Sequence, residues 1–174
     1  MEEAVFYKST DNTIYMKASG HVTALVCPPL KAAVFGRIDS DPRVEKIYLE
    51  LSDCEYMDST FLGLIVGTQK RFARLSGGEK GSCPSIVLLD VNEACKGLLR
   101  TIGVLGMVEL SNEKIPFPAD LERLSGAGKA NARFILDAHE ELSELSPENS
   151  RRFGALTSLL KGSIAAEEGK KKPD

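Results

Sequence analysis

Hydrophobic and polar positions along the first two thirds of the chain predict an α/β domain. Segments with the two-residue period of a strand, or with continuous apolar character, predict strands near residues 5–7, 13–19, 46–51, 85–89 and 107–110. Segments with helical spacing lie between them, near residues 28–38, 60–75 and 93–102. Two strands followed by alternating helices and strands predict a mixed, mainly parallel sheet with helices packed on it.

The last third of the chain has only helical periodicity. Apolar residues spaced by three and four positions predict an αα-hairpin over residues 119–165. The run Ser146-Pro147-Glu148 is typical of a helix start, with a capping serine, a proline at the first position and an acid near the positive end of the dipole. We therefore expect a domain at residues 1–113, a helical extension at 114–166 and a disordered tail at 167–174.

Composition and charge fit a globular protein that does not bind nucleic acid directly. Hydrophobic residues make up 43% and charged residues 27%, and the formal net charge is −3. A nucleic-acid-binding domain normally has a basic face, which this balance does not favour. The chain contains no run of eighteen apolar residues and begins without the basic and apolar segments of a secretory signal. These features predict a cytoplasmic protein that does not span a membrane.

The residues that usually carry metal or nucleophile chemistry are few and scattered. The cysteines show no C-x-x-C spacing, which predicts reduced, mostly buried thiols and no metal site: Cys27, Cys54, Cys83 and Cys95. The two histidines do not lie in a recognisable nucleophile context. We expect His21 in a loop and His139 on a solvated helical face, and we predict no catalytic residues and no cofactor.

One short motif stands where the second helix begins. Asp58 and Ser59 are residue types preferred at helix N-caps, so alone they predict only a cap. Residues 56–63 read Tyr-Met-Asp-Ser-Thr-Phe-Leu-Gly and follow a predicted strand. This run resembles the signature of the STAS domain in bacterial anti-sigma factor antagonists, an aromatic residue, Met or Ile, then Asp-Ser-Ser/Thr-Gly-Leu-Gly. The resemblance covers about residues 4–112 and includes Gly77-Gly78 and the run 100–104.

The resemblance implies a STAS-like fold and a phosphorylation switch at Ser59. In that family the unphosphorylated protein binds an anti-sigma factor that is also a serine kinase, and so frees a sigma factor for transcription. Phosphorylation ends the interaction, and a serine phosphatase restores it. The implied partner-binding residues are Asp58, Ser59, Thr60, Phe61 and Thr23.

Two residues depart from the family pattern. Phe61 stands where the common motif has glycine, and Thr23 follows the second strand where the family often has aspartate. Both departures predict a partner surface that differs from the family's. Two alternatives remain open: a STAS-like scaffold that binds a partner constitutively, with Ser59 only a helix N-cap, and a small enzyme or nucleotide-binding domain.

Overall fold

The computed structural model describes residues 1–76, 84–125 and 129–171, and within them seven strands form one mixed sheet. The spatial order is β6-β5-β3-β2-β1-β7, and β4 pairs with β2 beyond this path. The strands are β1 (Ala4–Ser9), β2 (Thr13–Val22), β3 (Lys46–Glu50), β4 (Cys54–Met57), β5 (Val87–Leu89), β6 (Glu109–Ser111) and β7 (Glu122–Arg123). β1 pairs antiparallel with β2 and β7, and the other neighbours are parallel.

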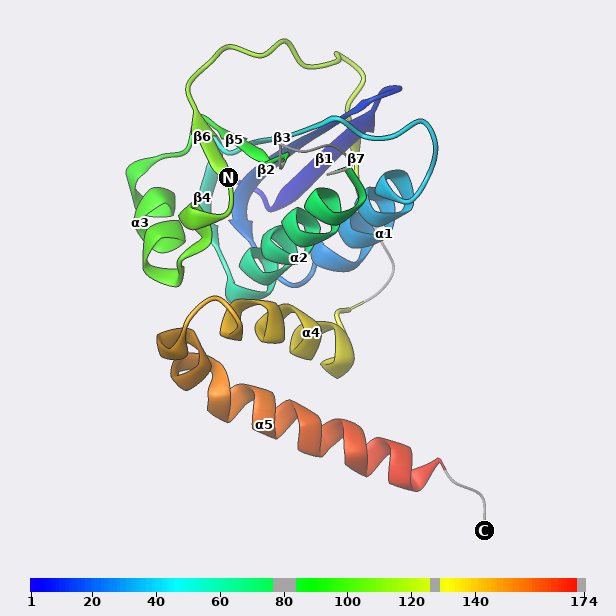
Figure 1. Cartoon of the computed structure of the whole chain (residues 1–174), viewed down its shortest axis with the longest axis vertical. Helices are drawn as coiled ribbons and strands as arrows, with labels where there is room; N and C mark the ends of the chain where they lie inside the picture. The colour runs from blue at the N-terminus through cyan, green and yellow to red at the C-terminus, as the bar shows by residue number, and fades with distance from the viewer. Residues whose placement is uncertain (77–83, 126–128, 172–174) are drawn as a thin grey trace.

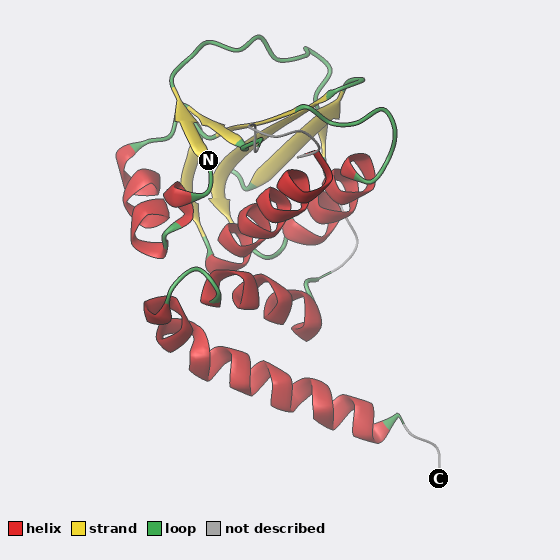
Figure 2. Cartoon of the chain, viewed as in Figure 1, coloured by secondary structure: helices red, strands yellow, loops and turns green. Residues whose placement is uncertain are grey.

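The helices form successive layers on the sheet. α1 (Cys27–Ile38) and α2 (Ser59–Ser76) lie side by side against one face, and α3 (Glu93–Ile102) lies near β4 (Figure 1). α4 (Ala132–Ser143) packs across α2, and α5 (Pro147–Lys170) lies beyond α4 (Figure 2). The predicted fold class, a mixed and mainly parallel sheet covered by helices and followed by a C-terminal helical hairpin, is confirmed.

Local capping explains why several helices begin and end where the sequence predicts. The Asn92 side chain accepts a hydrogen bond from the Cys95 amide at 2.9 Å, which starts α3. Gly103 ends α3 with a φ of 87°, a left-handed conformation that glycine adopts without strain. Ser146 caps α5 by accepting from the Asn149 amide at 3.0 Å, so the predicted start of this helix is confirmed.

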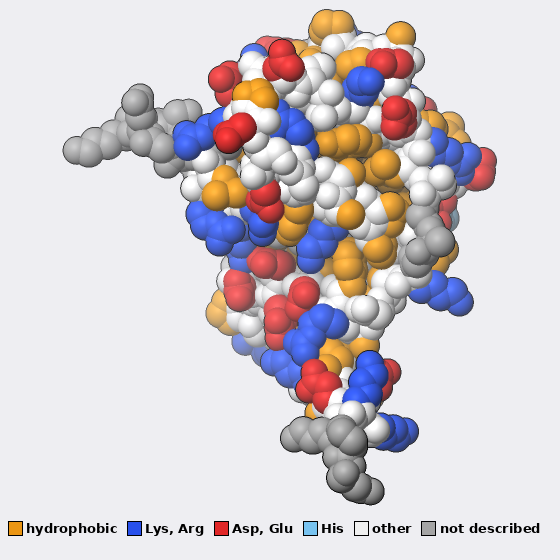
Figure 3. All heavy atoms as spheres, turned by 90° about the vertical axis from the view of Figure 1, so that its right-hand side faces the viewer, with side chains coloured by type: hydrophobic (Ala, Val, Ile, Leu, Met, Phe, Trp, Pro, Cys, Tyr) orange, Lys and Arg blue, Asp and Glu red, His pale blue; other side chains and the backbone are white. Residues whose placement is uncertain are grey.

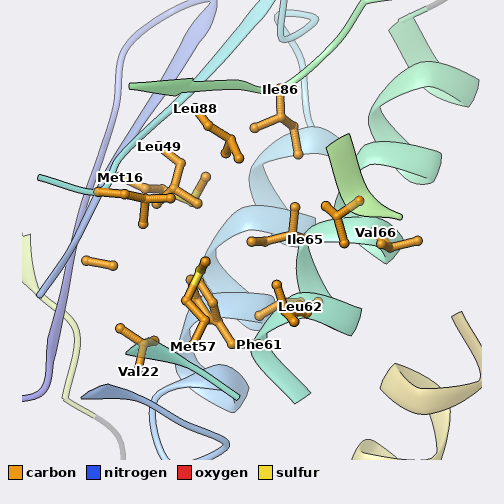
Figure 4. Packing of buried hydrophobic residues seen from close by; sticks show 14 of the residues in the cluster. Met16, Val22, Leu49, Met57, Phe61, Leu62, Ile65, Val66, Ile86 and Leu88 are labelled. Atoms are coloured by element: carbon orange, nitrogen blue, oxygen red, sulfur yellow. The ribbon is translucent and has the colours of Figure 1, made fainter. Parts of the chain in front are cut away.

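The core lies between the sheet and helices α1 and α2. Figure 4 shows side chains from β2, β3 and β5 facing side chains from α2 across this layer. Its central residues are almost completely buried: Ile14, Ile47, Leu49, Phe61, Leu62, Ile65, Phe72 and Leu88. Each Å² of apolar surface removed from water contributes about 25 cal/mol to the free energy of folding. This layer is therefore the main source of the domain's stability.

Several boundaries differ from the sequence expectation. β2 does not end at Ser19, because a bulge at Gly20, with a φ of 70°, lets the strand continue to Val22. β4 was not among the predicted strands, because its four residues are too few to show a strand period. The hairpin begins at residue 132 rather than 119, since residues 122–123 pair with β1 and join the sheet. α5 continues through 167–170, which were assigned to the tail, while 172–174 and the Gly77-Gly78 pair lie outside the described residues.

The surface carries charges of both signs. Figure 3 shows basic and acidic side chains interspersed around a band of hydrophobic atoms on one face. Among the residues that the structure describes, no helix combines the length and the apolar character needed to cross a lipid bilayer.

Candidate functional site at the start of helix α2

Two loops meet at the carboxyl ends of parallel strands. β2 and β4 are parallel neighbours, and their last residues, Val22 and Met57, are paired. The Asp58 amide continues this pairing by donating to the Val22 carbonyl at 2.9 Å. The turn that enters α2 therefore lies beside the loop that enters α1. In parallel sheets this edge is where loops from different strands converge and functional sites are commonly built.

Asp58 holds the two loops together with both of its carboxylate oxygens. Its Oδ1 accepts a hydrogen bond from the Phe61 amide at 2.9 Å, and its Oδ2 accepts from the Ala24 amide at 2.8 Å. The first bond is that of an N-cap and the second fixes the loop before α1. Asp58 therefore caps α2, and the idea that Ser59 is the N-cap is wrong: Ser59 is the first residue inside the helix.

The Ser59 side chain contacts the C-terminal hairpin. Its Oγ lies 2.7 Å from Nε2 of His139 on α4, and the Nδ1 of that ring lies 2.7 Å from the Ile135 carbonyl oxygen. Because a carbonyl oxygen only accepts, Nδ1 carries a proton. In the neutral ring Nε2 is then an acceptor, and the Ser59 hydroxyl donates to it.

The expectation of a solvated His139 is wrong. The residue is 2% exposed, and its ring packs edge-on against Phe153 of α5 with centroids 5.3 Å apart. The spacing of Ile135, His139 and Leu142 places all three on one helical face, a signal in the sequence that indicated burial. His21 also differs from expectation, since it lies in β2 rather than in a loop.

Two residues expected at the partner surface are buried instead. Phe61 is 1% exposed and Thr60 is 4% exposed. Phe61 points from α2 towards the core and lies beside Met57 (Figure 4). The phenyl ring that replaces the motif glycine fills space beneath the helix, so Phe61 and Thr60 do not form an accessible contact surface.

Thr23 remains at the site and is fixed by an acidic residue that the sequence did not indicate. Both its amide and its hydroxyl donate to Oε1 of Glu3, at 2.7 Å and 2.8 Å. Glu3 precedes β1, so this pair of bonds ties the start of the sheet to the loop between β2 and α1. Thr23 therefore positions the loop that Asp58 also holds.

Cys27, Cys54 and Cys95 are buried, and burial disfavours ionisation of their thiols. Burial, with the negative charges of Asp58 and Glu3, raises the pKa of Cys27 well above its ordinary value. Burial also raises the pKa of Cys54, to about 12, and that of Cys95. Thiolate formation is suppressed at neutral pH as a result. In the described ranges no three His, Cys, Asp or Glu side chains come together as a metal site would require.

A groove of about 330 Å³ runs between α1, α2 and α4 near the site. Its walls include Lys31, Phe35 and Phe134, and neither Ser59 nor His139 lines it.

The Ser59–His139 contact reproduces one link of a nucleophile–base pair, but the group behind the histidine is a helix carbonyl rather than a carboxylate. The arrangement is a part-buried hydrogen bond that occupies the serine hydroxyl.

Solved structures share this fold. The sequence matches no family model and no curated protein. The unphosphorylated form of SpoIIAA, an anti-sigma factor antagonist, matches with a TM-score of 0.51 and 16% identity, covering 62% of this chain and 89% of its own. The Thermotoga maritima protein TM1081 in its NMR structure matches with a TM-score of 0.50 and 24% identity, covering 60% and 78% of the two chains. The chain therefore has the STAS-like fold of anti-sigma factor antagonists, and more than a third of it has no counterpart in these structures.

Proposed function

We propose that the chain is an anti-sigma factor antagonist switched by phosphorylation of Ser59. Unphosphorylated, it binds an anti-sigma factor that is also a serine kinase, and a sigma factor is freed for transcription. Phosphorylation ends this binding, and a serine phosphatase restores it. The role is regulatory rather than catalytic, and we place it in the cytoplasm. The observation that carries the proposal is the position of Ser59, immediately after the capping Asp58 at the first residue of α2 in a STAS-like fold.

The surface around Ser59 suits protein binding. Leu25 follows Ala24, whose amide donates to Asp58, and its side chain is 58% exposed. Tyr56 in β4 is 48% exposed. Each lies two residues from a site residue, Leu25 from Thr23 and Tyr56 from Asp58, where exposed apolar surface can contribute to partner binding. With Thr60 and Phe61 buried, the proposed contact residues are Asp58, Ser59, Thr23 and these two apolar neighbours.

A phosphate at Ser59 would act directly on binding. It adds about −1.5 to −2 charges at neutral pH, beside the carboxylate of Asp58. The positive end of the α2 dipole stabilises this charge within the domain, whereas a docked partner surface would meet repulsion and lose solvation. A loss of about 3–4 kcal/mol corresponds to two to three decades in affinity.

The test combines capture with intact-mass analysis. The immobilised full chain is exposed to lysate from its source organism, and the bound fraction is incubated with ATP and fresh protein. We expect an anti-sigma factor with serine kinase activity in that fraction and a gain of one phosphate. Ser59→Ala should gain none, while Ser52→Ala, which removes another serine on an exposed stretch, should still gain one. Full phosphorylation of Ser59→Ala would contradict the site assignment.

Constitutive binding is the competing account, and a second variant separates the two. Ser59→Asp should weaken capture of the same anti-sigma factor by at least about tenfold, because the added charge lies at the contact surface. Equal capture of Ser59→Asp and wild type would favour constitutive binding.

A further inference from the structure

The α4–α5 hairpin partly covers Ser59, the residue that the proposed function requires to be accessible. Nε2 of His139 on α4 lies 2.7 Å from Oγ of Ser59, and the His139 ring is itself buried against Phe153. A kinase must place the hydroxyl in line with a phosphoryl group, and a partner must reach the same surface. Neither is compatible with an imidazole ring seated on Oγ.

The face of α2 below the hairpin is shaped for close helix approach. Gly63 lies one turn after Ser59, and the three atoms nearest to a Cβ built on it all belong to the backbone of Ala138 on α4. The Cβ would lie far inside van der Waals contact with the Ala138 carbonyl. Only a glycine at position 63 allows α4 to lie as close as it does.

The next positions on the same face hold α4 by polar contacts. Lys70 pairs with Glu141 at 2.5 Å and with Glu144 at 2.6 Å. Partial burial lowers the pKa of Lys70, but the two carboxylates outweigh this and raise the pKa above its ordinary value. This end of the contact therefore depends on two ion pairs that are partly exposed to water.

The turn between α4 and α5 is anchored to α3. Asn149, which is 1% exposed, donates from Nδ2 to the Ile102 carbonyl and to the Leu142 carbonyl, both at 2.8 Å. Leu142 and Phe153 belong to the buried cluster. The hairpin is thus seated in one defined position rather than attached loosely.

We propose that the α4–α5 hairpin is an autoinhibitory cover, which must move away before Ser59 can be phosphorylated or the surface around it can bind a partner. This inference rests on the proposed function of Ser59. The relation is reciprocal, because a phosphate on Oγ and the docked His139 ring compete for the same space. Docking of the hairpin slows modification of Ser59, and a phosphate on Ser59 favours the open hairpin.

A thiol introduced at position 59 measures the opening without any partner. The full chain carries Ser59→Cys in a Cys83→Ser background, and iodoacetamide labelling is followed by intact mass. Cys27, Cys54 and Cys95 are buried with raised pKa values, so their reaction is slow. Adding Gly63→Ala should accelerate labelling of the introduced thiol by about tenfold or more, because the new Cβ forces α4 away.

The matched control is Gly67→Ala, one turn further along the same face. Its Cβ would meet only the flexible Glu141 side chain, at 3.6 Å, an ordinary contact. Labelling should stay within about twofold of the parent. An unchanged rate in a folded Gly63→Ala protein, judged by its circular dichroism, would overturn the proposal.

If Gly63→Ala does not fold, a surface substitution at Lys70 provides the same labelling test. Lys70→Glu places a third acid opposite Glu141 and Glu144, and it should also accelerate labelling of the introduced thiol. Lys96→Glu disrupts a comparable exposed pair, with Glu93 on α3, and should leave the rate unchanged. Equal rates in Lys70→Glu and Lys96→Glu would count against the cover.

The captured kinase then separates this inference from the proposed function. Faster labelling with Gly63→Ala, but no phosphate on Ser59 in either protein, would support the cover and refute the phosphorylation switch. Equal labelling, with equally fast phosphorylation of wild type and Gly63→Ala, would support the switch and refute the cover.

Discussion

Helix α2 has two faces that make different kinds of contact. Towards the sheet it presents Phe61, Ile65 and Phe72, all buried in the core. Towards α4 it presents Ser59, Gly63, Gly67 and Lys70, which are small or polar. At 3.6 residues per turn, the first set spans about 40° of the helix and the second about 80° on the opposite side.

The difference explains how one helix can belong to a stable domain and also present a removable contact. Separating α2 from the sheet would expose large apolar side chains, at a cost comparable to unfolding the domain. Separating α2 from α4 breaks the serine–histidine contact and two ion pairs, and it also removes Leu142 and Phe153 of the hairpin from the buried cluster, a smaller apolar loss than separation from the sheet. Local opening of such a region requires less free energy than global unfolding.

The largest expected effect is on the sheet-facing side. Phe61→Ala should lower the free energy of unfolding by about 3–5 kcal/mol, because it removes a fully buried ring and leaves a cavity. Urea denaturation followed by circular dichroism measures the loss. Phe134→Ala, which truncates a half-buried ring on α4, should cost about half as much or less. Equal losses would contradict the distinction between the two faces.

An intermediate effect is expected at the helix start, which joins the two faces. Asp58→Ala should cost about 1–2 kcal/mol, because it removes the cap of α2 and the acceptor for the Ala24 amide. Asp58→Asn should cost less, since its amide oxygen can still cap the helix. The same urea titration compares the variants, and a neutral Asp58→Ala would show that these two hydrogen bonds are not structural.

The smallest effects are expected on the face of α2 that contacts α4. Gly67→Ala should stabilise the protein by about 0.5–1 kcal/mol, because alanine favours a helix interior and its Cβ fits. Gly63→Ala has the same propensity gain but should show no net stabilisation, because the backbone of α4 opposes it. If thermal unfolding showed the same rise for both variants, the close approach at Gly63 would be refuted.

Much of the sheet domain and the start of α2 could be predicted from local pattern. The strand and helix periods located the elements of the sheet, and the sequence placed Asp58 and Ser59 where a helix begins. The burial of Phe61 could also have been predicted, because it shares a helical face with Ile65 and Phe72. Phe61 was assigned to the partner surface because it stands where the family motif has glycine. Its helical spacing already indicated that it belongs to the core.

The contact between Ser59 and His139 could not be predicted in the same way. The two residues are 80 positions apart, and helical periodicity shows that a face is buried without showing what buries it. The short strands β4 and β7 were missed for a related reason. Two to four residues carry too little pattern, and their pairing with β2 and β1 is decided by the assembled sheet.

Native-state hydrogen exchange tests the central claim, that the outer contact of α2 opens separately from the core. Amides of α4 and α5 in the full chain should exchange by a partial opening whose free energy lies at least about 2 kcal/mol below that of the α2 amides facing the sheet. Denaturant should lower the free energy of that α4 opening less steeply than the free energy for the α2 amides, because the partial opening exposes less surface. If α4 and α2 amides exchange with the same free energy and the same denaturant dependence, the hairpin is part of one cooperative unit and the account is wrong.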